Sequence, residues 1–283
     1  MRRVTSTDRH DSESTPVLDA LEQYYDGVPR SSARVEDFGP LSLFVREGAG
    51  WPFYARPTLG FAGSVGAEDV ERVRSRQREL GQPEAFEWVA ETTPSLRAAA
   101  EAAGLRVHAH PLMVLGPDEP AARPAAGAGV TVRLLDAGDP ALAAAVAVPQ
   151  LAFAEPGTRL GTAGPAELAT ATLTAARDGS LDRVAGRIRA GLTRVAAASE
   201  DGVVLCSGMH QPVDGVSEIV GVGTLPTARR RGLARAVTAA LVADARARGV
   251  RTVFLSAGDE DVARVYAAVG FRPVGTALIA EPA

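Results

Sequence analysis

Residues 220–237 (VGVGTLPTARRRGLARAV) constrain the fold more than any other part of the chain. The segment begins as an apolar strand that stops at Pro226, passes through three arginines and a glycine, and becomes helical. Leu233, Val237 and Leu241 recur every four residues, which places them on one face of a helix. A turn that opens a helix leaves backbone N–H groups without acceptors at the positive end of the helix dipole. The segment therefore predicts an anion site, above all for phosphates.

Two other phosphate-binding loops do not fit this segment. The nucleoside-triphosphate loop requires a Gly-Lys pair, and the chain contains no lysine. The dinucleotide pattern Gly-x-Gly-x-x-Gly starts at Gly221 and Gly223, but proline stands where the third glycine is needed. The simpler alternative is that the three arginines form only a solvated basic turn.

A second pattern follows this helix. Residues 251–256 (RTVFLS) are strand-like, and Gly258 interrupts them. A helix is expected from about Glu260, with Tyr266 on its apolar face, and Gly270 ends it as a C-terminal cap. The next residues start a new extended run. The C-terminal part therefore alternates strands and helices after the anion-binding turn.

These two patterns resemble the GCN5-related N-acetyltransferase (GNAT) family. Arg229-x-x-Gly232-x-Ala234 is similar to the family's acyl-CoA pyrophosphate loop, and residues 261–271 (DVARVYAAVGF) are similar to its Ala-x-x-x-Tyr-x-x-x-Gly-Phe ending. From residue 130 the expected order is one strand, two helices, three strands, helix, strand, helix and strand, as in the family. The resemblance implies an α+β fold, with a central, mostly antiparallel twisted sheet flanked by helices.

Composition divides the chain into four segments. Residues 1–15 are polar with no apolar run behind them, which predicts a disordered leader and not a signal peptide. Residues 116–129 (GPDEPAARPAAGAG) are typical of a linker. Residues 130–283 carry the acetyltransferase pattern. Residues 16–115 are interpreted as a degenerate GNAT-like domain, so the fold is predicted to contain two tandem domains.

The weaker repeat in residues 16–115 rests on the order helix, strand, helix. Its two helices end at Gly81 and Gly104, 23 residues apart, and the corresponding helices of the second half end at Gly249 and Gly270, 21 residues apart. The first half lacks the Arg-x-x-Gly-x-Ala loop and has alanine at residue 100, where the second half has its tyrosine. We therefore do not expect it to bind acyl-CoA in the same way.

The resemblance implies acetyl-CoA as co-substrate. The pantetheine arm would pair with the backbone of Val222, Gly223 and Thr224. The pyrophosphate would rest on the amides of the turn and the first helical residues, which are Arg229, Arg230, Arg231, Gly232, Leu233 and Ala234. The family often has a cofactor-binding asparagine seven residues before the tyrosine, and this chain has Asp259 there.

Two residues are candidates for proton transfer. The resemblance makes Tyr266 the general acid for the departing thiolate, and the alternative is a core aromatic residue. Glu218 lies on a strand of period two and is expected to share a face with Val220 and Val222. A carboxylate among apolar residues often has a shifted pKa, which favours Glu218 as the base. The alternative is a solvent-facing glutamate.

The acceptor side is less defined. Phe153 and Glu155 lie in a loop between two helices that often closes over the acceptor in this family, and His210 ends the strand beside that of Glu218. These three are candidate substrate-binding residues, and Glu155 and His210 are alternative bases. No metal site is predicted, because His108 and His110 have no third ligand in reach.

Composition excludes several classes of protein. The net charge of −4 gives no reason to expect nucleic acid. The one cysteine, Cys206, excludes an internal disulfide framework and is interpreted as a buried core thiol. No apolar run approaches the roughly 18 residues of a membrane span. The expected compartment is the cytoplasm.

The function predicted from the sequence is acetyl transfer from acetyl-CoA to a primary amine of a small-molecule acceptor, in a direct ternary complex. Two alternatives stay open. One is an acyl-CoA-binding or sensing module that does no chemistry. The other is a protein N-acetyltransferase whose N-terminal domain docks the target. Because members of the family often pair, a homodimer is also compatible with the sequence.

Overall fold

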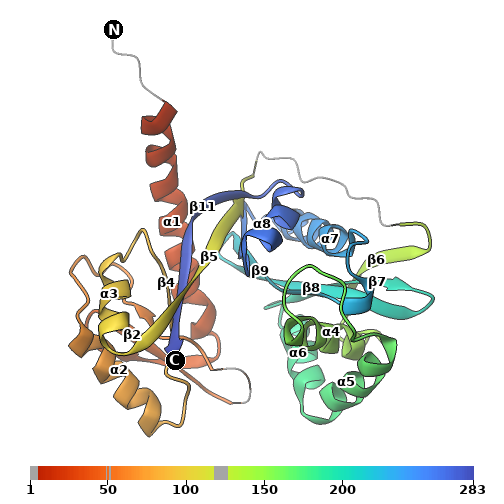
Figure 1. Ribbon diagram of the computed structural model, residues 1–283, viewed down its shortest axis with the longest axis horizontal. Coiled ribbons are helices and arrows are strands. Elements are labelled where there is room, and N and C mark those ends of the chain that lie inside the picture. The colour runs from red at the N-terminus through yellow and green to blue at the C-terminus, as the bar shows by residue number, and fades with distance from the viewer. Residues whose placement is uncertain (1–5, 49, 51, 118–126) are drawn as a thin grey trace. The chain divides into compact units, whose positions relative to one another are not determined.

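The computed structural model describes residues 6–48, 50, 52–117 and 127–283. Two compact units are distinguished by their contacts: unit 1 is Met1–Leu112 with Pro273–Ala283, and unit 2 is Met113–Arg272. Figure 1 labels their helices and strands. The sequence assigned residues 273–283 to the C-terminal domain, but these residues group with the N-terminal part. Most of the expected linker, residues 118–126, lies outside the described residues.

Unit 1 combines a small sheet, a second strand set and three helices. Its elements are α1 (Ser6–Arg30), β1 (Ala33–Asp37), β2 (Leu41–Arg46), β3 (Arg56–Pro57), α2 (Ala67–Glu79), β4 (Phe86–Val89), α3 (Ser95–Ala102), most of β5 (Leu105–Leu115) and most of β11 (Arg272–Pro282). Strands β1, β2 and β3 are antiparallel in that order. The leader expected to be disordered is helical from Ser6, and residues 1–5 lie outside the described residues.

The final strand belongs to unit 1 because it pairs with β4. The two strands run antiparallel, with Ala277 opposite Val89 and Ala280 opposite Phe86. Leu278 and Ala280 are buried in the core of this unit together with Trp88. The sequence could not assign this strand, because β-strand pairing is set by partners far away in the chain.

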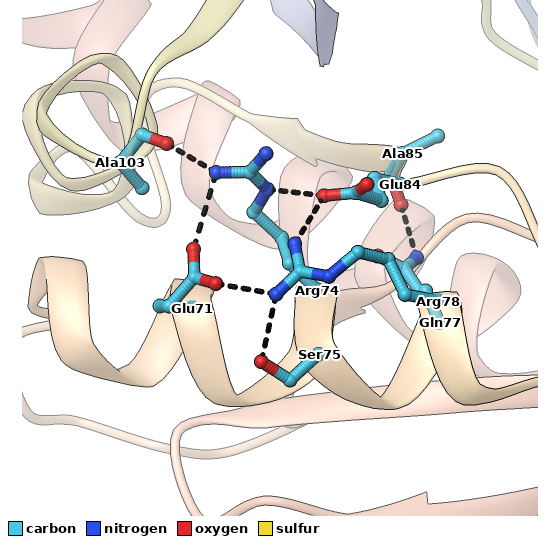
Figure 2. A network of polar contacts seen from close by, with 8 residues as sticks. All are labelled: Glu71, Arg74, Ser75, Gln77, Arg78, Glu84, Ala85 and Ala103. Carbon is cyan, nitrogen blue, oxygen red and sulfur yellow. Dashed lines mark hydrogen bonds and ion pairs between the residues drawn. The ribbon is translucent and has the colours of Figure 1, made fainter.

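Figure 2 shows a polar network that fastens α2 in unit 1. Arg74 donates to Glu84 at 2.7 Å and to the carbonyl of Ala103 at the end of α3. Arg78 donates to Glu71 at 2.6 Å and to Glu84 at 2.8 Å. The two arginines and two glutamates neutralise one another, so the network links α2 to α3 and to the turn before β4.

Unit 2 is built on one sheet with helices on both faces. Its elements are the end of β5, β6 (Val130–Leu135), α4 (Leu142–Ala154), α5 (Pro165–Arg177), α6 (Ser180–Arg189), β7 (Arg194–Glu200), β8 (Val203–Val213), β9 (Val216–Thr224), the short 3₁₀ helix η1 (Pro226–Ala228), α7 (Leu233–Ala247), β10 (Thr252–Ser256) and α8 (Glu260–Ala267). The strand order is β5–β10–β9–β8–β7–β6. The pairs β6–β7, β7–β8 and β8–β9 are antiparallel, and β9–β10 is parallel. The order of elements predicted from residue 130 onward is confirmed with one exception. Three helices, and not two, lie between β6 and β7.

Helix α4 packs on one face of this sheet and α7 on the other (Figure 1). A Cβ atom on Gly223 would lie 2.8 Å from Pro149 Cα and 2.9 Å from Ala152 Cβ, both in α4. A Cβ atom on Gly208 would lie 3.3 Å from Leu241 Cδ1 in α7. Glycine at residue 223 therefore lets α4 approach the sheet backbone, whereas a side chain at residue 208 would first meet Val222 Cγ2 on the neighbouring strand, at 2.8 Å.

A hydroxyl group of the sheet compensates for a proline inside α4. Pro149 has no N–H, so the carbonyl of Ala145 loses its usual helical donor. The buried Ser207 hydroxyl on β8 donates to that carbonyl at 2.6 Å. One hydrogen bond thus satisfies the helix and fixes α4 on the strand.

No helix of the described residues is both long and apolar enough to cross a membrane.

Replacing Ser207 by alanine is expected to destabilise unit 2. The carbonyl of Ala145 would stay buried without a donor, which costs about 1–3 kcal/mol. The measurement is chemical denaturation followed by fluorescence or circular dichroism. Thr172→Ala is the control, because Thr172 donates to Leu168 within a single helix. An equal loss of stability in both variants would contradict the role given to Ser207.

Candidate active site

Strands β9 and β10 separate immediately after Glu218. Their parallel pairing ends with Phe254 opposite Glu218. Strand β9 continues to Thr224, whereas β10 stops at Ser256. Among the described residues, the edge of β9 that faced β10 therefore has no paired strand beyond Glu218. Open strand edges accept an added chain through backbone hydrogen bonds.

A β-bulge interrupts β9 at the start of this open edge. Val220 lies opposite Met209 and Gly223 opposite Ser207, so β9 advances three residues where β8 advances two. Gly221 takes the extra step with a φ of +63°, a conformation that favours glycine.

The bulge corrects one prediction about this strand. Glu218 was expected to share a face with Val220 and Val222. Because paired residues lie on the same face, Glu218, Val220 and Gly223 face α4 with their partners on β8. Val222 instead faces α7: its Cγ2 atom would lie 2.8 Å from a Cβ on Gly208. The prediction was wrong for Val222 because strict alternation does not continue through a bulge.

The open edge leads directly to the start of α7. Gly232, with a φ of +75°, is the N-cap residue, and the first turn contains no acidic residue. The amides of Gly232, Leu233 and Ala234 have no acceptor in the part of the chain that the structure describes. This helix start therefore has the free amides that an anion site requires, and the binding of an anion there stays a prediction.

Helices α2, α5 and α8 begin with a carboxylate of their own that accepts from a backbone N–H group. Asp69 accepts the N–H of Gly66 at 2.8 Å at the start of α2, and Glu167 accepts the N–H of Gly164 at 2.8 Å at the start of α5. Asp259 caps α8 by accepting the N–H of Val262 at 2.8 Å. A carboxylate at these positions satisfies the amides that an external anion would need.

Asp259 has a structural role at the start of α8 that differs from the one predicted from the sequence. It was a candidate for binding the cofactor, but its carboxylate is used as the N-cap of α8. Aspartate is among the preferred N-cap residues because its oxygen accepts from the first amides of a helix. The side chain therefore has a local structural partner.

The three arginines before α7 differ in their surroundings. The buried Arg229 donates to the carbonyls of Ala152 and Arg159 at 2.9 Å each, and to the carbonyl of Glu155. Its guanidinium thus binds the C-terminal end of α4, where the helix dipole is negative. The exposed Arg231 pairs with Glu200 at 3.0 Å.

Arg230 is exposed and has a φ of +65°. Neither its position nor that of Leu233 and Ala234 conflicts with the predicted contact through backbone amides. Leu233 is buried in the core and fixes the first turn of α7, and Ala234 is half-buried.

Glu155 organises the loop between α4 and α5. Its carboxylate accepts the N–H of Thr162 at 3.0 Å, the N–H of Ala163 at 2.8 Å and the Thr162 hydroxyl at 3.0 Å. These backbone N–H groups lower the pKa of Glu155, so it is ionised and engaged in the loop. This geometry does not favour the predicted roles in acceptor binding or as an alternative base.

Phe153 was expected in the loop between two helices, but it lies in the last turn of α4, with 61% of its surface exposed. An apolar side chain of this size on the surface is available for contact with a ligand or partner. Its role in acceptor binding stays a prediction, and Phe153 lies at the end of the helix that Arg229 binds.

Tyr266 lies in the core of unit 2, only 8% exposed, with its ring edge-to-face against Phe271 at 6.2 Å. Burial, with a smaller contribution from Cys206, raises the pKa of its phenol, which therefore stays protonated at neutral pH. No hydrogen bond to the phenol oxygen exists within the described residues. Its proton is thus not committed to another group of the chain.

Cys206 on β8 contacts Thr224 on β9. The Thr224 hydroxyl donates to Cys206 Sγ at 3.2 Å across the β8–β9 pair. The thiol is fully buried, and burial raises its pKa to about 12. The expectation of a buried core thiol is confirmed, and Thr224 has a side-chain partner besides the predicted backbone contact.

Glu218 is half-buried at the point where β9 leaves β10. It lies opposite Gln211 on β8 and opposite Phe254 on β10. The predicted base therefore stands at the beginning of the open edge.

His210 was predicted to bind the acceptor or to act as an alternative base, but it is fully buried, which does not favour either role. Its Nδ1 atom lies 2.8 Å from Ser217 Oγ, and its Nε2 atom lies 2.9 Å from Asp244 Oδ2. Burial lowers the pKa of His210, and the bond to Asp244 opposes this only in part. His210 is therefore neutral and links β8, β9 and α7.

The hydrogen bonds of His210 to Ser217 and Asp244, and that of Thr224 to Cys206, were not predicted from the sequence. Asp214 and Gly215 form the turn of the β8–β9 hairpin, with Val213 opposite Val216. Counting back from such a turn pairs Gln211 with Glu218 and brings His210 near Ser217. No comparable signal in the sequence points from His210 to Asp244, 34 residues away on α7.

The buried His210 predicts a pH-dependent stability. Its pKa is lower in the folded state than the ordinary value of 6.5, so the unfolded chain binds the proton more readily. The stabilisation is present above about pH 6.5 and is lost as the pH falls from there through the folded-state pKa. Denaturation between pH 8 and pH 5 should show this loss. His210→Gln should flatten the dependence, and His108→Gln, an exposed histidine, should leave it unchanged.

Comparison with known proteins identifies the family of this unit. The sequence pattern of the acetyltransferase (GNAT) family matches residues 168–271. This segment includes β9, the turn before α7, and Tyr266. A search of curated proteins finds no significant match.

Solved structures share the fold at low sequence identity. A GCN5-related N-acetyltransferase from Kribbella flavida is 22% identical with a TM-score of 0.70, over 94% of this chain and 96% of that one. A tandem GNAT protein from the clavulanic acid biosynthesis pathway is 19% identical with a TM-score of 0.55, over 85% and 77%. A GCN5-related N-acetyltransferase-like protein from Streptococcus suis is 12% identical with a TM-score of 0.53, over 95% and 98%. Residues 168–271 therefore belong to the GNAT acetyltransferase family, and the chain has the mixed, mostly antiparallel α+β fold of GNAT proteins.

Proposed function

We propose that unit 2 transfers the acetyl group of acetyl-CoA to a primary amine of a small-molecule acceptor, in a direct ternary complex. The observation that carries this proposal is the continuity of the open β9 edge with the uncapped amides of α7. A long ligand with an amide-containing arm and a pyrophosphate fits this arrangement. The arm adds to the strand edge, and the pyrophosphate accepts hydrogen bonds at the helix start.

The reaction requires the amine to lose a proton and the thiolate to gain one. The amine nitrogen attacks the thioester carbonyl carbon, the C–N bond forms, and the C–S bond breaks. Glu218 accepts the amine proton, directly or through water, from its position at the start of the open edge. The buried phenol of Tyr266 gives its proton to the departing thiolate and is later reprotonated from solvent.

The backbone around the bulge is suited to the remaining task, which is to stabilise charge on the carbonyl oxygen. We assign this role to a backbone N–H near Val222, in the unpaired part of β9. A fixed donor aimed at developing charge accelerates acyl transfer more than a flexible one.

Unit 1 is not proposed as a second acyl-CoA site. At its comparable helix α2, Asp69 already accepts the N–H of Gly66. Glu68 and Asp69 also place negative charge in the first turn, which repels a phosphate.

Calorimetric titration of acetyl-CoA tests the cofactor site. Gly232→Glu is expected to abolish micromolar binding, because its carboxylate would repel the pyrophosphate at the start of α7. The space around Gly232 is open, so a larger side chain meets no atom within 4 Å, although its positive φ is strained for any residue except glycine. Gly232→Gln is the matched control, since it has the same size and backbone strain without the charge. Equal binding by both variants would contradict the phosphate site.

Turnover with a panel of amines tests the two proton-transfer roles. We expect Tyr266→Phe and Glu218→Gln each to lower kcat by roughly 10²-fold or more, the usual contribution of a positioned acid or base. The Kd for acetyl-CoA should stay unchanged, because neither residue contacts the pyrophosphate. The exposed Arg189→Gln, at the end of α6, serves as the surface control.

Three outcomes separate the candidate functions. Turnover that depends on Tyr266 supports the small-amine acetyltransferase. Saturable binding of acetyl-CoA without turnover of any amine or peptide would favour a sensing module. Turnover of peptides alone would favour a protein acetyltransferase.

A further inference from the structure

Three hydrogen-bonded side chains, buried or partly buried, form a network on the face of β9 opposite to Glu218. Ser217 Oγ is 2.8 Å from His210 Nδ1, and His210 Nε2 is 2.9 Å from Asp244 Oδ2. Ser217 and His210 are fully buried, and the Asp244 side chain is 14% exposed. The network connects one residue each from β9, β8 and α7.

The hydrogen-bond directions follow from the groups themselves. A carboxylate only accepts, so His210 carries its proton on Nε2 and donates to Asp244. Its Nδ1 atom is then an acceptor, and the Ser217 hydroxyl donates to it. Every polar atom of the imidazole is thus satisfied in one tautomer, which fixes the orientation of the ring.

This arrangement is not a hydrolase triad. Ser217 has no exposed surface, so a substrate does not reach its hydroxyl. His210, which would have to act as the base of a triad, is also fully buried and held between β8, β9 and α7. A role in positioning therefore fits the geometry better than nucleophilic catalysis.

Asp244 has further partners that hold it in place. Arg248 donates to the same carboxylate oxygen at 2.7 Å, and Arg194 on β7 forms an ion pair with it at 3.5 Å. Burial raises the pKa of Asp244, but the hydrogen bonds from His210 and Arg248, together with the charges of Arg248 and Arg194, lower it overall. The network therefore ends on α7 at the ionised carboxylate of Asp244.

Ser217 lies next to the point where the pairing of β9 with β10 ends. Ser217 precedes Glu218, and Glu218 is the last residue at which β9 pairs with β10. On the other side of Glu218, β9 enters the bulge and the open edge. The Ser217–His210 bond thus holds β9 at the position where pairing with β10 ends.

We propose that Ser217, His210 and Asp244 are positioning residues that fix Glu218 at the start of the open β9 edge and tie that edge to α7. This inference rests on the proposed function of Glu218 as the base. The side chains do not touch the substrates. They determine where β9 leaves β10, and small displacements of a reacting group cost large factors in rate.

The test compares two variants that each lose one buried hydrogen bond to His210. Ser217→Ala removes the donor to its ring, and Thr193→Val removes the donor to its carbonyl, which is bound at 3.1 Å by the fully buried Thr193. We expect Ser217→Ala to lower kcat by roughly 10- to 100-fold with an unchanged Kd for acetyl-CoA. Thr193→Val should leave kcat within about twofold, although both variants lower the Tm.

A pH profile adds a readout that a loss of stability alone does not change. In Ser217→Ala the acidic limb of kcat/KM should shift, because a displaced Glu218 has a different environment. If Ser217→Ala keeps the wild-type kcat and pH profile while its Tm falls as in Thr193→Val, the three residues are only structural and the proposal is overturned.

Hydrogen–deuterium exchange tests the positioning without any activity. We expect faster exchange over residues 216–221 in Ser217→Ala than in the wild type or Thr193→Val. Unchanged exchange there overturns the proposal, whether or not the enzyme turns over. Faster exchange in a protein that acetylates no amine supports the placement of β9 by these residues and identifies the proposed function as the part that failed.

Discussion

The interruption of β9 at Gly221 is the constraint on which the site depends. An extra residue with a φ of +63° changes which side chains face α4 and which face α7. It follows directly on the point where β9 leaves β10, so a strand edge is open beside Glu218. A regular strand would continue the pairing and its alternation, and would offer a ligand no backbone edge.

Close packing of α4 and α7 keeps this interrupted strand in place. Gly223 lets α4 approach the backbone, and Ser207 satisfies the carbonyl that Pro149 leaves without a donor. Arg229 binds the end of the same helix from the turn before α7. The turn before α7, the open edge and the end of α4 that carries Phe153 are thus held by a small number of buried polar contacts, which are costly to break.

The two units differ in the charge at a comparable helix start. In α2, Asp69 satisfies the amide of Gly66 and adds negative charge. In α7, the corresponding amides have no acceptor among the described residues and no acidic residue lies in the first turn. The two helix starts therefore present opposite electrostatic conditions to an anion, and this difference supports assigning the proposed chemistry to unit 2.

The sequence by itself determined the order of most helices and strands, the turn before α7 and the family resemblance, because hydrophobic period, proline and glycine act locally. Tertiary structure alone decided the pairing of β11 with β4, the bulge that separates Val222 from Glu218, and the burial of His210. It also gave Arg229, Glu155 and Asp259 their partners within the chain. Each of these depends on which atoms a side chain meets after folding, and residues far apart in sequence supply those atoms.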